Sequence, residues 1–299
     1  MEATNNLFDF YAKFSTEQAC RDFLEHSRWA NGIICPKCGV IGKSYRFKDG
    51  RLFKCGDCRQ PFTVRVGTIF EDSMLPLQKW FLAIYLATSL KKGISSIQLA
   101  KYLGITQKSA WFVLHRIRKV VEDSGDGNML GGITEIDESY LGGIQKGHRG
   151  RASNTSNKAT VFGAVERKGN IKVIHVPNSR GETLLPAIQH HIKPSATIMS
   201  DEYTVYKPLE RMGYTHYEIN HTLHFGIGTV HTNSIEGFWS QLKRGINGIY
   251  HHVSKKHLQL YCSEYEYRYN TRGMKDGERF ENWMGAAQGK RLTHKSLIA

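Results

Sequence analysis

The chain has 299 residues and carries 41 Lys and Arg against 27 Asp and Glu, a formal net charge of +14. Such an excess of positive charge favours an anionic partner, and nucleic acid is the leading candidate. The longest uninterrupted apolar stretch, residues 80–87, is far shorter than the roughly 20 residues that cross a bilayer, which argues against a transmembrane helix. The 40% of hydrophobic residues is typical of a folded chain, and the length predicts more than one domain.

Five segments are predicted along the chain from helical and strand-like periodicity. Their bounds are 1–30 for a helical lead-in, 31–68 for a small β-rich module, 69–125 for a helical domain, 130–272 for a mixed α/β domain and 273–299 for a basic C-terminal tail. The main domain boundary is placed at the stretch that follows residue 122, which is rich in Gly, Asp and Asn.

Cysteine usage indicates a metal site. Four of the six cysteines form two close pairs, whereas Cys20 and Cys262 lie far from them and are expected to be free thiols. The first residues lack the basic flank and apolar run of a signal peptide. We therefore expect a protein of the reducing cytoplasm rather than one held together by disulfides.

The spacing within and between the cysteine pairs predicts a four-thiolate zinc ribbon over residues 31–68. The expected ligands of one zinc ion are Cys35, Cys38, Cys55 and Cys58. Because four thiolates leave no position for a reactive water, the zinc is expected to be structural. The same module can also contact DNA through the basic side chains Lys37, Lys54 and Arg59.

Residues 96–114 have the turn and capping residues that are typical of a helix-turn-helix motif. Ala100 is small enough for two helices to cross closely, Gly104 can adopt a left-handed turn, and Thr106 can cap the second helix. The side chains expected to point outward from that helix, toward bases and phosphates, are Gln107, Lys108, His115, Arg116 and Arg118. The alternative is an amphipathic helix pair with a solvated basic face, and the net charge favours DNA binding.

Three acids stand out in the α/β domain. Asp137 and Asp201 each lie at the end of a predicted strand, and Glu236 lies on a predicted helix further along. Carboxylates from adjacent strands repel each other unless divalent cations such as Mg²⁺ lie between them. Each acid alone is more simply a strand-end, turn or helix-surface residue. Their combination in a basic protein favours a metal site.

The motifs around these acids carry a family resemblance. The stretches IDESYLGG (136–143), SDEY (200–203) and HTNSIEGFWSQLKR (231–244) resemble the ISXO-type insertion-sequence transposases, which are DDE transposases related to Merlin elements. The resemblance covers about residues 15–272 and includes an N-terminal zinc ribbon. It implies a multidomain protein with a zinc ribbon, a helix-turn-helix domain and a ribonuclease H-like catalytic domain.

The resemblance also implies a chemistry. Asp137, Asp201 and Glu236 would hold two Mg²⁺ or Mn²⁺ ions that support cleavage of transposon ends and joining of the 3′-hydroxyls to target DNA. Some members have asparagine in place of the third acid, and Asn233 lies one helical turn before Glu236, so the third ligand is one of these two. His231 is expected to contact a metal ligand or a phosphate rather than to hold a second zinc.

Further DNA contacts are expected from a basic loop after the Asp137 strand and from the helix that carries Glu236. The residues are Lys146, His148, Arg149, Arg151, Lys243 and Arg244, for which ordinary surface charge is the alternative. The expected partners are double-stranded DNA with terminal inverted repeats, target DNA, and at least one further copy of the chain, on the bacterial nucleoid. Two rival functions remain: a DNA-binding regulator with an inactive ribonuclease H-like domain, and a nuclease that cuts without joining.

Overall fold

The computed structural model describes residues 6–122, 127–142, 158–219 and 231–298. The chain divides into two compact units, one formed by Met1–Val121 with Gly273–Ala299 and the other by Glu122–Arg272. In the described part of the chain, no helix is both long enough and apolar enough to cross a membrane.

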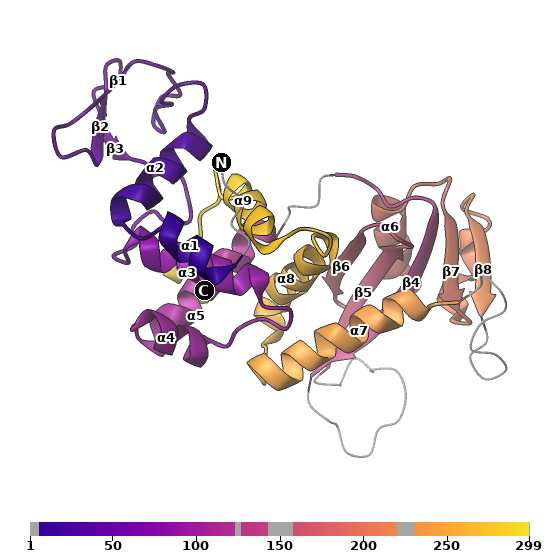
Figure 1. The fold of residues 1–299 in the computed structure, drawn as a ribbon. Coiled ribbons are helices and arrows are strands. Elements are labelled where there is room, and N and C mark those ends of the chain that lie inside the picture. Colours follow the sequence, from indigo (N-terminus) through magenta and orange to yellow (C-terminus); the bar gives the residue numbers. More distant parts are fainter. Residues whose placement is uncertain (1–5, 123–126, 143–157, 220–230, 299) are drawn as a thin grey trace. The chain divides into compact units, whose positions relative to one another are not determined.

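The first unit combines helices with a small antiparallel sheet (Figure 1). Its helices are α1 (Leu7–Lys13), α2 (Glu17–Arg28), α3 (Leu77–Ser89), α4 (Ser96–Leu103), α5 (Gln107–Val121), α9 (Asp276–Ala286) and α10 (His294–Ile298). Its strands, in the order β1-β2-β3, are β1 (Ser44–Arg46), β2 (Leu52–Cys55) and β3 (Pro61–Thr63). The small sheet is therefore a three-stranded meander, as a zinc ribbon requires.

Aromatic side chains join the N-terminal and C-terminal helices of this unit. The ring of Phe280 on α9 lies 5.1 Å from Phe10, 5.6 Å from Phe14 and 5.5 Å from Phe81, measured between centroids. Trp283 on the same helix is fully buried. Residues 273–299, expected as a basic tail, thus contain a helix that completes the core of the first unit, because α9 presents its apolar residues at helical spacing.

The second unit is a mixed five-stranded sheet with helices on both faces. Its strands are β4 (Ile133–Leu141), β5 (Ala159–Glu166), β6 (Ile171–Val176), β7 (Thr197–Asp201) and β8 (Thr215–Ile219). Its helices are α6 (Gly181–His191), η1 (Thr204–Leu209), α7 (Asn233–Gly245), η2 (Ile246–Tyr250), η3 (Lys255–His257) and α8 (Leu258–Asn270). The sheet order is β6-β5-β4-β7-β8.

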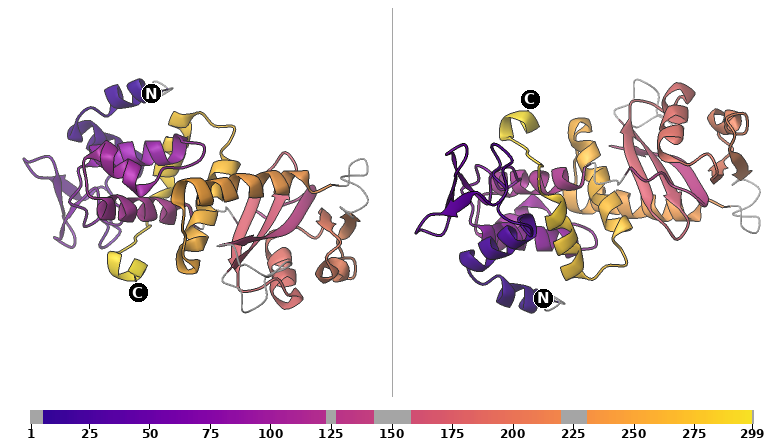
Figure 2. Two further views of the ribbon diagram at one scale, coloured as in Figure 1. Left: turned by 90° about the horizontal axis from the view of Figure 1, so that it is seen from below. Right: turned by 90° about the horizontal axis from the view of Figure 1, so that it is seen from above.

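Strand direction changes across this sheet. The pairs β6/β5 and β5/β4 are antiparallel, whereas β4/β7 and β7/β8 are parallel. Helix α7 covers one face and α6 the other, as the two views in Figure 2 show. This order, these directions and the helices on both faces make up the ribonuclease H-like fold that the sequence predicted. Because both faces are covered, β5 is buried over Ala159–Val165.

Helix α8 protects the edge strand β6. Three backbone amides of β6, each two residues apart, donate hydrogen bonds to side chains of α8. The pairs are Ile171 N with Asn270 Oδ1 (2.8 Å), Val173 N with Glu266 Oε2 (2.9 Å), and His175 N with Gln259 Oε1 (2.7 Å). These bonds satisfy edge groups that would otherwise be available to pair with another strand.

Candidate functional site

The four paired cysteines converge. Cys35 Sγ lies 3.7 Å from Cys58 Sγ, Cys38 Sγ lies 3.6 Å from Cys55 Sγ, and all four sulfurs lie within 4.8 Å of one another. Zn–S bonds of about 2.3 Å in a tetrahedron place the sulfurs about 3.8 Å apart, so the observed spacing suits zinc. The cysteines are positioned to bind a structural zinc, as the sequence predicted.

Local turns aim these thiols at one point. Cys35 N donates to Val40 O (3.0 Å) and Cys55 N donates to Gln60 O (3.2 Å), which closes a tight turn around each pair. Desolvation raises the pKa of Cys55, but hydrogen bonds from the backbone amides of Cys58 and Asp57 and with the thiols of Cys38 and Cys58 together lower that pKa to about 7. The same contacts between thiols raise the pKa of Cys58 to about 12. The backbone amides of this turn thus favour the thiolate of Cys55, and the thiolate is the form that binds zinc.

The remaining cysteines are not part of this cluster. Cys20 and Cys262 are buried free thiols, in agreement with the sequence prediction. Burial raises the pKa of Cys20 to about 12. Both side chains therefore behave as small apolar core residues.

Helices α4 and α5 form the helix pair that the sequence predicted. Gly104 ends α4 in the left-handed conformation with φ 58°, and Thr106 Oγ1 accepts the amide of Ser109 at 3.2 Å. Gln107 and Lys108 are exposed at the N-terminus of α5. In helix-turn-helix proteins the N-terminal residues of the second helix approach the base edges, so these two side chains are placed suitably for DNA contact.

Three other residues of α5 do not point outward. His115, Arg116 and Arg118 are only 0%, 6% and 2% exposed. Arg116 donates to Ile69 O (2.7 Å) and to Leu292 O (2.9 Å), so its guanidinium satisfies backbone carbonyls of its own unit. The expectation that these three residues are displayed to DNA is wrong, because α5 packs against α3, α4 and α9 and its later turns lie inside the unit.

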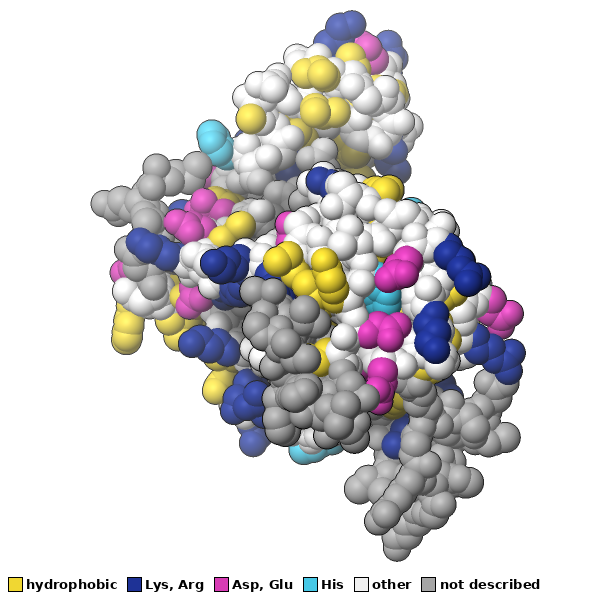
Figure 3. All heavy atoms as spheres, turned by 90° about the vertical axis from the view of Figure 1, so that its right-hand side faces the viewer, with side chains coloured by type: hydrophobic (Ala, Val, Ile, Leu, Met, Phe, Trp, Pro, Cys, Tyr) yellow, Lys and Arg dark blue, Asp and Glu magenta, His cyan; other side chains and the backbone are white. Residues whose placement is uncertain are grey.

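Charged residues are spread over the second unit. Lys243 and Arg244 are exposed in the last turn of α7, and Arg244 Nε donates to Ser240 O at 3.0 Å. On the face drawn in Figure 3, Lys and Arg side chains are interspersed with Asp and Glu among the described residues. The expected basic loop residues lie outside the described residues; they are Lys146, His148, Arg149 and Arg151.

The two predicted aspartates lie on neighbouring parallel strands. In the β4/β7 register Glu135 pairs with Met199, and Asp137 and Asp201 are each two residues further along their strands. Because side chains alternate along a strand, both acids are on the face covered by α7. Glu236 lies in the first turn of α7. The fold therefore brings the three acids to one end of the sheet.

The charges of Asp201 and Glu236 act on the carboxyl group of Asp137. The pKa of Asp137 is raised to about 6, first by burial and then by the charges of Asp201 and Glu236, against the opposing hydrogen bonds from Glu138 N and Trp239. Asn233, the other candidate for third ligand, is the first residue of α7, and both Asn233 and Glu236 are exposed. A cluster of oxygen ligands in which like charges repel suits a hard divalent cation such as Mg²⁺.

Hydrogen bonds fix the orientation of the acids. Asp137 Oδ1 accepts Glu138 N (2.8 Å), and Asp137 Oδ2 accepts the indole Nε1 of Trp239 (2.9 Å). Asp201 Oδ1 accepts a backbone amide at 3.1 Å. Glu236 Oε1 accepts the hydroxyl of Thr232 at 3.0 Å. Sequence reasoning did not identify Trp239, although its position one turn after Glu236 places it on the same helix face.

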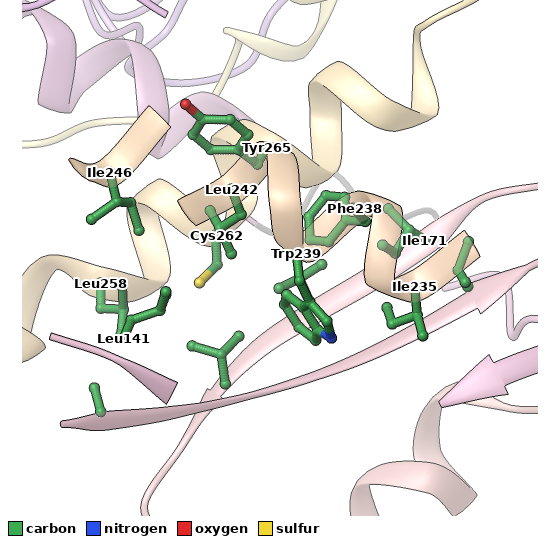
Figure 4. Close-up of a cluster of buried hydrophobic side chains, with 14 residues drawn as sticks. Leu141, Ile171, Ile235, Phe238, Trp239, Leu242, Ile246, Leu258, Cys262 and Tyr265 are labelled. Atoms are coloured by element: carbon green, nitrogen blue, oxygen red, sulfur yellow. The ribbon is translucent and has the colours of Figure 1, made fainter. Parts of the chain in front are cut away.

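A glycine on β5 makes room for this indole. Gly163 pairs with Asp137 in the β4/β5 register. A Cβ atom on Gly163 would lie 2.7 Å from Trp239 Cη2 and Cζ2 and 2.9 Å from Ile235 Cδ1. Figure 4 shows the side chains of Ile235 and Trp239 pointing from α7 onto the strands. Because glycine has no side chain, α7 can approach β5 closely enough for Trp239 to reach Asp137.

His231 lies in a polar network beside the acids. Its Nδ1 is 3.2 Å from Glu135 Oε1 and 3.0 Å from Arg167 Nη2. Neither Glu135 nor Arg167 was identified from the sequence. The signal available was weak, namely an acid two residues before Asp137 on the same face of a strand.

Together these features define a zinc-ribbon protein whose ribonuclease H-like domain carries acids on adjacent strands. Residues 129–270 match the model of the ISXO2-like transposase domain, and residues 15–61 match that of the transposase zinc-ribbon domain. The chain is 32% identical over 108 residues to an "uncharacterized transposase-like protein" of Haemophilus influenzae, covering 36% of this chain and 87% of the relative. The chain belongs to the ISXO2-like transposase family.

Two further similarities were found. An "uncharacterized protein in transposable element ISH50" of Halobacterium salinarum is 28% identical over 274 residues, which is 85% of this chain and 91% of the relative. A solved structure, "Crystal structure of a pre-cleavage Mos1 transpososome", aligns over 67% of this chain and 76% of that chain with 11% identity and a TM-score of 0.20. At that TM-score the alignment carries no argument about this chain.

Proposed function

We propose that this transposase cleaves the ends of its element and joins the resulting 3′-hydroxyls to target DNA at a two-metal site held by Asp137, Asp201 and Glu236. The observation that carries the proposal is the placement of Asp137 and Asp201 on neighbouring strands, with Glu236 on the helix that covers them. Burial, and after it the charges of Asp201 and Glu236, raise the pKa of Asp137 to about 6. Such a cluster is costly unless divalent cations neutralise it. Two Mg²⁺ ions bound there would activate water or a 3′-hydroxyl and stabilise the leaving oxygen.

The chain's own residues would set the geometry for this chemistry. Trp239 Nε1 and Glu138 N each donate to one oxygen of Asp137, which fixes the plane of that carboxylate. The amide of Tyr203 does the same for Asp201. We propose Glu236 as the third ligand rather than Asn233, because its carboxylate acts electrostatically on Asp137 and neutralises cation charge that an amide cannot.

We also propose how DNA is held. The exposed Gln107 and Lys108 of α5 would contact the element's terminal repeats, and Lys243 and Arg244 on α7 would contact phosphates near the acids. The basic loop between β4 and β5 would contribute through Lys146, His148, Arg149 and Arg151. Because two ends must be brought together, the acting form would be at least a dimer on double-stranded DNA of the bacterial cytoplasm.

The test uses the full chain, labelled DNA that carries an end of the element, and Mg²⁺. Asp137→Ala and Asp201→Ala should each lose at least about a thousandfold in cleavage rate, because each removes a ligand of the ions that drive the reaction. Their DNA affinity in a mobility-shift assay should stay within a few-fold of the wild type. Glu202→Ala is the matched control, since Glu202 is an exposed acid next to Asp201. Retained cleavage by both alanine variants would show that the site lies elsewhere.

The same reaction separates the two rival functions. Cleaved ends that never become joined to a target plasmid would indicate a nuclease that cuts without joining. DNA binding by the wild type without cleavage in Mg²⁺ or Mn²⁺ would indicate a regulator with an inactive domain. The proposal requires products in which element ends are joined to the target plasmid, and these products should not form when a chelator removes the divalent cations.

A further inference from the structure

Glu135 is a buried carboxylate two residues before Asp137 on β4, with 0% of its surface exposed. Four donors point at its two oxygens. They are Arg167 Nε (2.7 Å), Ser234 N (2.7 Å), Ser234 Oγ (3.0 Å) and Ile235 N (3.1 Å). An acid on the same face of the strand as Asp137 could itself bind a metal, but these contacts already occupy the oxygens of Glu135.

The contacts make Glu135 the acceptor for the start of α7. The first amides of a helix have no partner within the helix, and a negative charge there also interacts favourably with the helix dipole. In α7 the amides of Ser234 and Ile235 donate to Glu135, while the hydroxyl of the preceding Thr232 donates to Glu236. The helix is therefore capped by a carboxylate from a different element, which ties its first turn to β4.

Arg167 extends this attachment to the segment before α7. Its Nη2 donates to His231 O at 2.8 Å, while its Nε donates to Glu135. Arg167 follows directly after β5, so the chain entering α7 is bonded to the end of β5 as well as to β4. Charged hydrogen bonds of this kind, buried from water, are stronger than neutral ones.

The attachment has a consequence for the third acid. Glu236 directly follows the two residues whose amides donate to Glu135 and precedes Trp239, which donates to Asp137. A helix bonded to one strand at two points, one turn apart, cannot easily rotate or slide along that strand. The position of Glu236 relative to Asp137 is thus set by bonds on either side of it.

We propose that Glu135 is a positioning residue, which acts through the backbone of α7 to hold Glu236 at the distance from Asp137 that a shared divalent cation needs. This inference rests on the proposed function of the three acids. It assigns Glu135 a role that depends on its two acceptor oxygens as well as on its charge. Glutamine offers one acceptor and an amino group that would face the same donors, so Glu135→Gln should loosen the start of α7.

The test measures metal binding by the full chain without DNA. Titration calorimetry with Mn²⁺ should show that Glu135→Gln weakens binding about 10–100-fold, the range seen when residues that orient metal ligands are changed. Amide hydrogen exchange in the metal-free protein should accelerate at Ser234 and Ile235 more than in α8. Cleavage by this variant should recover toward the wild-type rate at high Mn²⁺, because the ligands themselves remain.

Two controls separate positioning from general destabilisation. Leu258→Ala removes a buried side chain from the core that α7 and α8 share, away from the first turn of α7. It should lower the melting temperature yet keep Mn²⁺ affinity within about twofold. If Glu135→Gln behaves like Leu258→Ala, with a lower melting temperature and unchanged Mn²⁺ affinity, the positioning role is refuted.

A second variant and a parallel titration complete the design. Should Glu135→Gln not fold, Glu135→Asp keeps the charge but shortens the reach to the helix by one methylene, and it should weaken Mn²⁺ binding severalfold. Unchanged affinity in that variant would overturn the proposal. Asp137→Ala is titrated alongside: if it binds Mn²⁺ as the wild type does, the metal site itself is misplaced, which is a different failure from that of Glu135.

Discussion

Gly163→Ala adds a single methyl group opposite Asp137 and should disturb the site without removing any ligand. The new Cβ would lie 2.7 Å from two ring atoms of Trp239 and 2.9 Å from Ile235 Cδ1. Carbon atoms in contact are normally about 3.5–4.0 Å apart, so the indole must move by about 1 Å. The indole of Trp239 covers Gly163 from the side of α7, so we expect it to move away from the sheet together with α7.

The size of the effect follows from that displacement. The bond from Trp239 Nε1 to Asp137 Oδ2 is 2.9 Å long, and a shift of about 1 Å takes it beyond the range of a hydrogen bond. Overpacking of a core and loss of one bond to a charged group together cost about 2–4 kcal/mol. For a unit of this size the melting temperature should fall by about 5–15 °C. Mn²⁺ affinity should fall about tenfold or more, since Asp137 loses the bond that orients it.

The assay is thermal unfolding of the full chain, followed by Mn²⁺ titration at a temperature where every variant is folded. Gly237→Ala is the matched control, because Gly237 lies on the exposed face of α7 and a Cβ there meets nothing within 4 Å. Alanine at that helical position should stabilise the protein by about 0.5–1 kcal/mol. A Gly163→Ala protein with wild-type melting temperature and Mn²⁺ affinity would refute the argument that close approach of α7 orients Asp137.

Three other predictions follow from the same structure. Glu236→Gln should lose nearly all cleavage while Asn233→Ala is impaired less, and the opposite order at saturating Mg²⁺ would make Asn233 the ligand. Protein purified without chelator should contain one zinc per chain, and Cys38→Ser should lose both that zinc and the folded ribbon; elemental analysis without zinc would contradict this. Burial raises the pKa of Asp137 from 3.8 to about 6, so ionising this side chain opposes folding of the metal-free protein. With a chelator present, the unfolding free energy of Asp137→Asn should exceed that of the wild type increasingly as the pH rises from about 4 to about 6. Above about pH 6 the difference should stay constant, at up to about 3 kcal/mol. Equal unfolding free energies of the two proteins at pH 8 would contradict the raised pKa.

The features that the sequence alone determined are those set by local chemistry. Two residues between cysteines force both thiols of a turn toward one ion, so the ligands Cys35, Cys38, Cys55 and Cys58 were predictable without a fold. The break between α4 and α5 was predictable because Gly104 tolerates a left-handed conformation and Thr106 has a capping hydroxyl. The placement of Asp137 and Asp201 on neighbouring strands was predictable because acids at the ends of apolar strands stand out against their neighbours.

Tertiary structure decided which residues of a helix are covered. Arg116 lies on α5 among basic residues that suit DNA, yet it is buried. Its guanidinium donates hydrogen bonds to the backbone carbonyls of Ile69 and Leu292 instead. Those partners lie far away along the chain, and helical periodicity carries no information about them. Phe280 belongs to the core of the first unit for the same reason, since only the folded chain places it against Phe14 and Phe81.

The supporting residues of the acid cluster were also decided by the tertiary structure. Glu135 accepts amides about a hundred residues away in sequence, and Trp239 reaches Asp137 across a glycine on a third element. A ligand needs only its own chemistry to be recognised, whereas a residue that orients a ligand is defined by contacts between β4, β5 and α7. Such contacts exist only once the strands are in register and the helix is packed, because a hydrogen bond tolerates changes of only a few tenths of an ångström in the donor–acceptor distance.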